Sequence, residues 1–366
     1  MKEKICWVTS GYLLQVDLPL LHKLQGYYDI KWVVYASAGS DMAKHAEDYA
    51  HIHRVDFTLF YSLRHRYNPM IHSDFVKQMK EIQAYNADIY YFNMIAFPYM
   101  IFAIKRYLPA NKVIMAMHHG HIHRGMQLRH IYKYYLRFLC NQPFWFQYFS
   151  KTQASYFIGD VSRRFIIPLA LNDFGKGDSV LPQDCVVFLS FGNIIKTKNI
   201  GLLIKAACMV KEQCDKPFKV KIVGHCRSWR YYQSLIKYPE IFDLQIKRVP
   251  DNEIPNIFSS AHYLVLPYLS VTQSGPLRIA YGYNLPVITS DLPGFKESVV
   301  EGTTGLMFAS NDVNDLAMLM IKCINGHPSL YERLKGSQKE YVGKNLSVDA
   351  VVSQYVTMFN NILHLK

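Results

Sequence analysis

The stretch from Leu264 to Ser290 (LVLPYLSVTQSGPLRIAYGYNLPVITS) constrains the fold of this chain more than any other. It opens on an apolar run, 263–266, that has the length of a strand and is too short for a helix. A polar loop then leads to Ser274-Gly275-Pro276, where serine can cap a helix and the fixed φ of proline suits the first turn. Apolar residues at helical spacing follow, and 287–289 forms another apolar run. Strand, loop, helix and strand make a βαβ unit, which is typical of a parallel sheet.

The start of this helix can bind an anion. Backbone N–H groups of a first turn and the positive end of the helix dipole both favour negative charge at Ser274, Gly275, Pro276 and Leu277. An ordinary capped crossover helix that binds nothing produces the same pattern. Both interpretations stay open from spacing alone.

The same alternation of strands and helices runs along both halves of the chain. Strands are expected at 5–8, 28–35, 87–93, 112–117, 153–158, 186–191, 218–223 and 245–249, and helices at 16–24, 98–108, 200–211 and 253–259. The polar stretch 172–184 is expected to be a linker. A chain of 366 residues is too long for one core. We therefore predict an α/β protein with two mostly parallel, doubly wound domains.

The positive charge of the chain is concentrated in its first half. The formal net charge is +13, and residues 1–170 carry 20 Lys and Arg against 11 Asp and Glu. No carboxylate occurs between Asp88 and Asp160, a stretch that holds eight Lys or Arg and five His. Such a field attracts phosphate groups on a diphosphate-linked substrate, an anionic lipid or a nucleic acid. No recognition motif supports nucleic acid, so none is expected as a partner.

The segment 128–149 combines basic and aromatic residues. Arg129, Lys133 and Arg137 recur every four residues, so a helix would place them along one side. The pattern fits a helix that docks on an anionic membrane face, and it also fits a core helix with one solvated basic side. No apolar run reaches the ~20 residues of a membrane span, and no signal peptide is apparent. The protein is therefore expected in the cytoplasm or peripherally on the inner face of the membrane.

Four histidines lie in the loop HHGHIHRG at 118–125, directly after an expected strand. They are not spaced i, i+4 on one helix, and no nearby carboxylate or cysteine completes a metal set. The seven cysteines form no Cys-x-x-Cys pair, so neither a zinc site nor a disulfide framework is indicated. Because loops at the carboxyl ends of parallel strands bind ligands, we expect a substrate wall here and no metal. Gly11, after the first strand, is a single glycine and leaves the nucleotide fingerprint incomplete.

With these elements placed, the sequence resembles the retaining glycosyltransferases of family 4 (glycosyl transferases group 1). Three segments carry the resemblance: FGNIIKTKNIGLLIKAA at 191–207, IKRVPDNEIPNIFSSAHYLVLPY at 246–268 and LPVITSDLPGFKESVVEGTTGLMF at 285–308. In the first half, His118, His123 and Gly125 are in register with the His-Asp…His-x-Gly loop of the family. The resemblance implies the GT-B fold, with two Rossmann-like domains facing a central cleft. The domains are an acceptor-binding domain at 1–170, a nucleotide-sugar-binding domain at 184–345 and a helix at 346–366 that crosses back to the first.

The resemblance implies transfer of a hexose-type sugar from a nucleotide-sugar to a glycan or lipid-linked acceptor in surface polysaccharide synthesis. The anomeric configuration would be retained, and no metal or other cofactor would be required. Lys198 would neutralise the diphosphate, and His118 would line the donor sugar. Further donor contacts would come from Gly11, Asn193, Val249, Pro250, Thr272, Gln273, Ser274, Gly275, Pro276 and Leu277. The acceptor side would be formed by His119, His121, His123 and Arg124.

Three positions depart from the pattern of the family. The Arg that follows the glycine of the first motif is Asn193 here, and the two Glu of the Glu-x7-Glu motif are Val271 and Ile279. Neither aliphatic side chain can accept a hydrogen bond from a hydroxyl. These departures keep open a catalytically impaired GT-B relative that acts as a binding protein. A nucleotide-sugar epimerase is another alternative, although the carboxylates it would need for acid–base chemistry are scarce.

Overall fold

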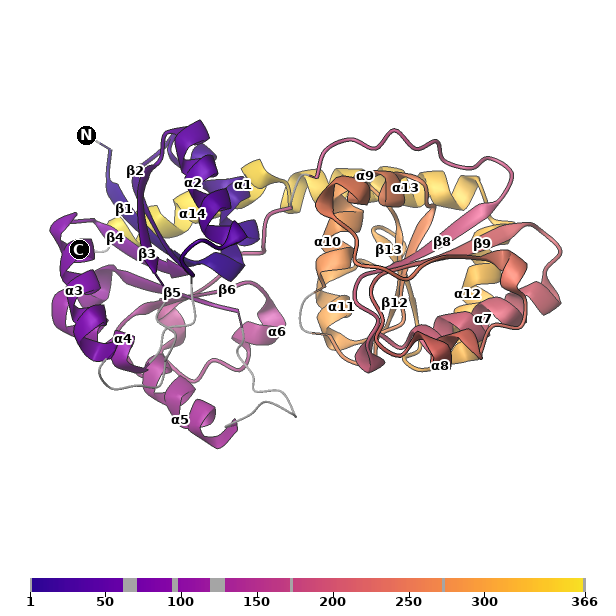
Figure 1. Ribbon diagram of the computed structural model, residues 1–366, viewed down its shortest axis with the longest axis horizontal. Helices are drawn as coiled ribbons and strands as arrows, with labels where there is room; N and C mark the ends of the chain where they lie inside the picture. Colours follow the sequence, from indigo (N-terminus) through magenta and orange to yellow (C-terminus); the bar gives the residue numbers. More distant parts are fainter. Residues whose placement is uncertain are drawn as a thin grey trace. The chain divides into compact units, whose positions relative to one another are not determined.

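The computed structural model describes residues 2–61, 71–93, 98–118, 129–171, 174–271 and 274–364 (Figure 1). The chain divides into two compact units. Unit 1 comprises Met1–Ala170 and Leu346–Lys366, and unit 2 comprises Leu171–Asn345. Each unit contains one sheet of paired strands that all run parallel.

The sheet of unit 1 has the strand order β3-β2-β1-β4-β5-β6-β7. Its strands are β1 (Lys4–Ser10), β2 (Asp29–Ala36), β3 (Asp56–Tyr61), β4 (Ile89–Asn93), β5 (Val113–Met117), β6 (Trp145–Tyr148) and β7 (Arg164–Ile166). Its helices are α1 (Leu14–Leu24), α2 (Asp41–His53), α3 (Ile71–Ala84), α4 (Pro98–Tyr107), α5 (Arg129–Cys140), α6 (Lys151–Ala154) and α14 (Val348–Leu363). In β1, Val8 is paired with Val33 of β2 and Phe92 of β4.

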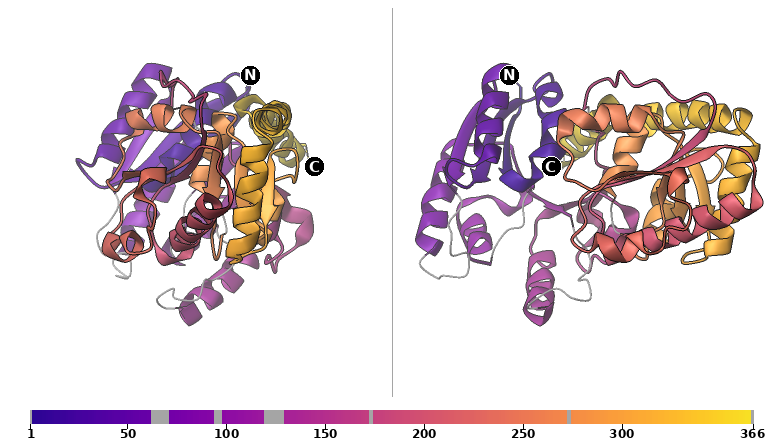
Figure 2. Two further views of the ribbon diagram at one scale, coloured as in Figure 1. Left: turned by 90° about the vertical axis from the view of Figure 1, so that its right-hand side faces the viewer. Right: turned by 45° about the vertical axis from the view of Figure 1, so that its right-hand side comes forward.

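Helices cover both faces of this sheet because its central strands are apolar on both sides (Figure 2). In β1, Cys6 and Val8 point into a core shared with α3, α4 and α5. The alternate residues Ile5 and Trp7 point into a second core, shared with α1, α2 and α14. The period of two along a strand thus divides the apolar residues between two cores.

The helix α14 packs against unit 1 although it comes from the far end of the chain. The Trp7 and Tyr91 rings lie 4.1 Å apart between centroids, and the Tyr355 ring lies 5.5 Å from Trp7. The hydroxyls of Tyr91 and Tyr355 are 3.1 Å apart. Phe359 is fully buried in the same core. Its aromatic residues make α14 an integral part of the first domain.

Truncation of Phe359 tests this packing. Phe359→Ala should lower the free energy of unfolding by about 3–5 kcal/mol, because a buried ring is lost and a cavity remains. Thr357→Ala changes an exposed residue of the same helix and is the matched control. Chemical denaturation measures both variants. Equal stabilities for the two variants would contradict the assignment of α14 to the core of unit 1.

The sheet of unit 2 has the order β10-β9-β8-β11-β12-β13. Its strands are β8 (Val186–Phe191), β9 (Phe218–Val223), β10 (Phe242–Gln245), β11 (Tyr263–Leu266), β12 (Val287–Ser290) and β13 (Gly305–Phe308). Its helices are α7 (Ile200–Gln213), α8 (Trp229–Gln233), α9 (Ile254–Ser259), α10 (Gly275–Gly282), α11 (Pro293–Ser298), α12 (Val313–Asn325) and α13 (Ser329–Asn345). α7 and α12 pack on one face of the sheet, and Phe258 of α9 contacts Phe191 from β8. The prediction of two doubly wound α/β domains is confirmed.

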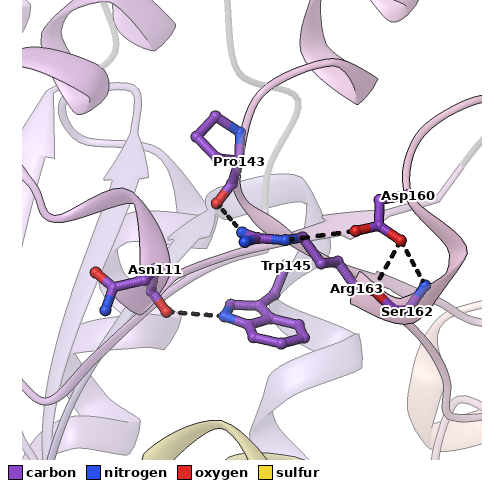
Figure 3. A network of polar contacts seen from close by, with 6 residues as sticks. All are labelled: Asn111, Pro143, Trp145, Asp160, Ser162 and Arg163. Atoms are coloured by element: carbon purple, nitrogen blue, oxygen red, sulfur yellow. Dashed lines mark hydrogen bonds and ion pairs between the residues drawn. The ribbon is translucent and has the colours of Figure 1, made fainter. Parts of the chain in front are cut away.

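A polar network joins three segments of unit 1 near the start of β6 and β7 (Figure 3). The Arg163 guanidinium donates to the carbonyl of Pro143 at 2.5 Å and lies 5.3 Å from the centroid of the Trp145 indole. The Trp145 indole N–H donates to the carbonyl of Asn111 at 2.8 Å. Asp160 accepts from Ser162 and lies 3.8 Å from the Arg163 Nε. Part of the positive charge of the first half is thus used to hold adjacent strands together.

Three details of the predicted secondary structure are wrong. The expected strand at 153–158 is instead the end of α6 and a turn, since Ser150 caps a helix by accepting from the Gln153 N–H at 3.1 Å. The basic segment 128–149 contains a helix only to Cys140, and β6 follows as a buried strand. The expected strand at 245–249 lies earlier, as β10, so Val249 and Pro250 fall in the loop that follows.

Candidate functional site

In unit 2, the strand order reverses direction between β8 and β11, which are neighbours in the sheet. Open α/β sheets bind ligands outside the carboxyl ends of their strands at such a switch point. The loop after β8 leads through the 3₁₀ helix η4 (Lys196–Lys198) into α7, and the loop after β11 leads into α10. The Leu269 N–H donates to the Thr197 carbonyl at 2.9 Å, so the two loops are tied together.

The loop after β8 is held in place by two glycines. Gly192 has φ +107° and Gly224 has φ +148°, both in the region that L side chains rarely adopt. A Cβ atom on Gly224 would overlap the Gly192 carbonyl, and one on Gly192 would lie 3.4 Å from the Pro276 Cγ. The loop therefore lies against the start of α10. Asn193, at its tip, is exposed.

The start of α10 has the predicted cap. The Ser274 hydroxyl accepts from the Leu277 N–H at 3.3 Å, and Pro276 occupies the first turn. This arrangement reduces the number of amides available to an anion, because Leu277 is capped and Pro276 has no N–H. Gly275 is exposed, and nothing lies within 4 Å of the position of its absent Cβ. Its amide and the helix dipole are what α10 offers to a ligand.

Lys198 supplies a half-buried positive charge beside this helix. Its Nζ lies 3.6 Å from the centroid of the Tyr268 ring, a cation–π contact. Tyr268 is buried after β11, and its carbonyl accepts from the Ser290 hydroxyl at 2.8 Å. Burial lowers the pKa of Lys198 to about 8, and no carboxylate of the described ranges contributes to that pKa. The site thus holds a cation to which the described residues offer no anionic partner. Tyr268 was not predicted, although the Pro-Tyr after an apolar strand marks its place.

Unit 1 has its own switch point, between β1 and β4. Polar residues end three adjacent strands there: Thr9 in β1, Asn93 in β4 and His118 directly after β5. The His118 Nε2 lies 2.6 Å from the Asn93 Oδ1, and its ring stacks on Phe149 at 4.3 Å between centroids. Gly11 lies at the same edge, where a Cβ would be 3.2 Å from both the Ala36 Cβ and the Tyr35 carbonyl. Close approach to β2 is the structural reason for this glycine.

The central member of this cluster was not predicted from the sequence. Asp17, on α1, is fully buried and accepts from the Thr9 hydroxyl and from the Asn93 Nδ2, the latter at 2.6 Å. Burial raises the pKa of Asp17 to about 7, while the hydrogen bonds from Thr9, Asn93 and Trp7 act in the opposite direction. An acidic residue among the apolar residues of VDLPLL was the available signal.

Several predicted site residues lie outside the described residues: His119, His121, His123, Arg124, Thr272 and Gln273. Within the described ranges, no group of three or more His, Cys, Asp or Glu is arranged to hold a metal. Val249 is half-buried and Pro250 exposed, ahead of the 3₁₀ helix η6 (Asp251–Glu253). Of the two positions that the resemblance aligned with the Glu-x7-Glu motif, Val271 lies against Gly294, and Ile279 is half-buried on α10.

Comparison with known proteins bears on this geometry. Residues 185–326 match the family model of glycosyl transferases group 1. The matched segment contains Gly192, Lys198, Tyr268 and the start of α10. A curated relative, glycosyltransferase 1 domain-containing protein 1 of Xenopus tropicalis, is 26% identical over 117 residues, 32% of this chain. That alignment spans 33%, about a third, of the length of the relative.

Solved glycosyltransferase structures share the fold of the whole chain. A glycosyltransferase from Rickettsia africae has a TM-score of 0.79 at 15% identity, with both chains covered completely. HepE from Anabaena, crystallised with UDP, has a TM-score of 0.75 at 13% identity, with 98% of this chain and 100% of that chain covered. Sucrose-phosphate synthase from Thermosynechococcus elongatus has a TM-score of 0.70 at 14% identity over the full length of both chains. These similarities show that the two Rossmann-like domains are those of the GT-B fold.

The half-buried Lys198 cation should reduce the stability of the protein, because burial disfavours its charged form. Lys198→Met keeps the apolar stem and removes the charge, so it should raise the melting temperature at pH 7. The pKa of Lys198 falls from 10.5 to about 8 on folding, so the unfolded chain holds an extra proton between these values. The free energy of unfolding of the wild type therefore rises as the pH rises from about 8 to 10.5. Over the same range, the difference in stability between Lys198→Met and wild type becomes smaller.

Thermal unfolding of Lys198→Met at pH 7 and pH 10 measures this effect. The control is Lys196→Met, which removes an exposed charge from the same 3₁₀ helix and should change little. A Lys198→Met protein that is less stable than wild type at pH 7 would mean that the Tyr268 contact outweighs the cost of burial.

Proposed function

We propose that this chain is a retaining glycosyltransferase that moves a sugar from a nucleotide-sugar to a glycan or lipid-linked acceptor in surface polysaccharide synthesis. The observation that carries the proposal is the half-buried Lys198 cation, held on Tyr268 beside the start of α10 in the segment that matches glycosyl transferases group 1. The structures of HepE with UDP and with UDP-glucose, on the same fold, support a nucleotide-sugar as the donor.

The chemistry of the transfer gives Lys198 its role. As the glycosidic bond breaks, negative charge gathers on the departing diphosphate. A fixed positive potential at that position stabilises the transition state more than the ground state. The Lys198 ammonium, the Gly275 amide and the dipole of α10 supply it. In this proposal the departing phosphate takes the proton of the acceptor hydroxyl on the same face, and His118 contacts the donor sugar. No metal is required.

The departures from the family pattern predict a lower affinity for the nucleotide. Asn193 brings no charge to the diphosphate. The half-buried Lys198 is then the cation that this loop offers to the diphosphate. Ile279 cannot accept a hydrogen bond from the ribose hydroxyls, and leaving a buried hydroxyl without a partner costs about 1–3 kcal/mol. Affinity for ribonucleotides should therefore be modest, and discrimination of ribose from deoxyribose should be lost. A catalytically inactive relative would also bind ribonucleotides with modest affinity, but it would show no turnover.

Turnover of nucleotide-sugars tests the proposal. Release of nucleoside diphosphate from UDP-, GDP- and ADP-sugars is measured for wild type, Lys198→Ala and the control Lys196→Ala. Lys198→Ala should lower kcat by at least about 100-fold, since a charge-assisted contact in the transition state contributes about 2–4 kcal/mol. The control should keep nearly full activity.

Thermal shifts with UDP, dUDP, GDP and ADP identify the base, because a ligand that binds the folded state raises its melting temperature. UDP and dUDP should give equal shifts. Near-normal turnover by Lys198→Ala would sink the assignment of this residue. Nucleotide binding without any turnover would favour the binding-protein alternative.

We also propose that α5 holds unit 1 against an anionic membrane face that presents a lipid-linked acceptor. Leu139 and Cys140 of α5 are buried in the core, whereas Lys133 and Arg137 are exposed. Tyr134, between them, is 73% exposed, an unusual position for a large aromatic side chain. The side chain of Arg129 lies outside the described residues. Within the described ranges, none of the helices has the length and apolar character required to cross a bilayer.

Sedimentation with vesicles tests the membrane proposal. Each Lys or Arg near an anionic surface contributes about 1 kcal/mol, so Lys133→Gln with Arg137→Gln should weaken binding to phosphatidylglycerol vesicles roughly 30-fold. The control pair, Lys339→Gln with Lys344→Gln, removes two exposed charges from α13. Binding that ignores lipid charge, or that falls equally in both pairs, would make α5 a core helix with a solvated basic side.

A further inference from the structure

Asp17 carries a buried carboxyl group that has no role in the proposed sugar transfer. It is fully buried on α1 at the carboxyl edge of the unit 1 sheet. No lysine or arginine of the described ranges contributes to its pKa. Its partners are neutral donors: the Thr9 hydroxyl, the Asn93 amide and the Trp7 indole, whose hydrogen bond also lowers the pKa of Asp17. A buried acid without a cationic partner is costly, so its position calls for an explanation.

The donors and acceptors around Asp17 form a chain with one direction. The Trp32 indole can only donate, and its N–H reaches the Thr9 hydroxyl oxygen at 3.1 Å. The hydroxyl proton of Thr9 is therefore directed to the Asp17 Oδ2. On the other side, the Asn93 Nδ2 donates to the Asp17 Oδ1 at 2.6 Å. An ionised Asp17 accepts from both neighbours.

This direction of hydrogen bonding fixes the orientation of the Asn93 side-chain amide. Because its NH₂ group faces Asp17, its carbonyl oxygen faces His118, 2.6 Å from the Nε2. A carbonyl can only accept, so the Nε2 must carry a proton and donate it. In the neutral ring, the proton is then on Nε2 and the lone pair on Nδ1. Stacking on Phe149 fixes the plane of the same ring.

We propose that Asp17 is a positioning residue that acts through Asn93 to hold His118 as its Nε2–H tautomer. The tautomer itself does not depend on any reaction. Its consequence for turnover rests on the proposed function, in which His118 contacts the donor sugar. A ring whose tautomer is fixed in advance can present one defined pattern of donor and acceptor to a sugar hydroxyl.

The state of Asp17 should make this device pH-dependent. Burial raises the pKa of Asp17 to about 7. The titratable groups that face it are the phenols of Tyr49 on α2 and Tyr91 on β4, with Tyr355 of α14 behind Tyr91, and His118 beyond Asn93. Burial raises the pKa of Tyr49 to about 12 and that of Tyr91 well above its usual value, so both phenols stay neutral near pH 7.

The sign of the pH effect follows from the hydrogen bonds. Above pH 7 the ionised Asp17 only accepts, and it keeps the Asn93 NH₂ group turned toward itself. Below pH 7 the protonated carboxyl can donate to the Asn93 oxygen, which frees the amide to turn and present its NH₂ to His118. The Nε2–H tautomer is therefore favoured above about pH 7 and loses its support as the pH falls below that value.

Replacing the acid by its amide tests the proposal. In Asp17→Asn, the new NH₂ group donates where the carboxylate accepted, so Asn93 must turn its oxygen toward position 17. Its NH₂ then faces His118, which should become the Nδ1–H tautomer. Nitrogen-15 NMR of labelled histidine at pH 8 reads the tautomer, and a His118→Gln spectrum assigns the signal. The hydrogen bonds with Thr9 and Asn93 are conserved and the buried charge is gone, so the melting temperature at pH 8 should equal or exceed that of wild type.

Exchanging the two groups should restore the tautomer. In Asp17→Asn with Asn93→Asp, a carboxylate faces the His118 Nε2 directly, and the new amide at position 17 donates to the other oxygen of that carboxylate. The ring should return to Nε2–H. In turnover of a nucleotide-sugar, the single variant should lose roughly 10–100-fold in kcat, with little change in donor KM. The exchanged pair should recover most of that loss, and the limb of the wild-type pH profile near pH 7 should be absent from the single variant.

The outcomes separate this inference from the proposed function. A wild-type His118 that is Nδ1–H at pH 8 overturns the inference, as does a tautomer that is the same in wild type and Asp17→Asn. A lower melting temperature with an unchanged tautomer assigns Asp17 a structural role only. If the single variant does not fold, the tautomer of the wild type and of the exchanged pair decides. A tautomer that switches as expected in a protein without turnover supports the inference and sinks the proposed function.

Discussion

The parallel direction of the strands is the constraint on which both candidate sites depend. In a parallel sheet every strand ends at the same edge, so the loops that follow neighbouring strands must meet. In unit 2 this brings Lys198, after β8, onto Tyr268, after β11. In unit 1 it brings Thr9, Asn93 and His118 together from β1, β4 and β5, around Asp17 of α1. Each cluster lies where the order of strands reverses, and there the helices diverge to opposite faces of the sheet.

Both clusters keep an ionisable group at a cost to stability. Burial lowers the pKa of Lys198 and raises that of Asp17, so in each case the folded protein disfavours the charged form. Neither is paired with an opposite charge of the described ranges. The apolar cores do not require these groups, since a methionine or an asparagine would fit with less electrostatic cost. Groups of this kind mark places where a protein has retained chemistry at the expense of stability.

The sequence pointed to the site of unit 2 more directly than to the cluster of unit 1. Gly192 and Lys198 lie in the strand–loop–helix segment after β8 that carries the family resemblance, and the Ser274 cap lies in a second such segment, after β11, that local spacing reveals. Tyr268 was not predicted, because its contact with Lys198 depends on the hydrogen bond between the loops after β8 and β11. Thr9, Asp17 and Asn93 are separated by up to 84 residues, and each alone is an unremarkable polar residue. Their common role appears only when β1, β4 and α1 lie side by side.

The sequence by itself determined the class of fold, because the length and spacing of apolar runs dictate strand or helix before any tertiary contact forms. It also determined the helix cap at Ser274, which is a local matter of side chain and backbone. The cap at Ser150, which makes a helix of 151–154, is a local signal of the same kind, and so are the capped Leu277 and the proline before it, which leave α10 one exposed amide. Tertiary structure decided which side chains from distant segments meet, such as Tyr268 and Lys198. The direction of hydrogen bonds through Asp17 was also decided there, since it depends on which groups burial leaves able only to donate or only to accept.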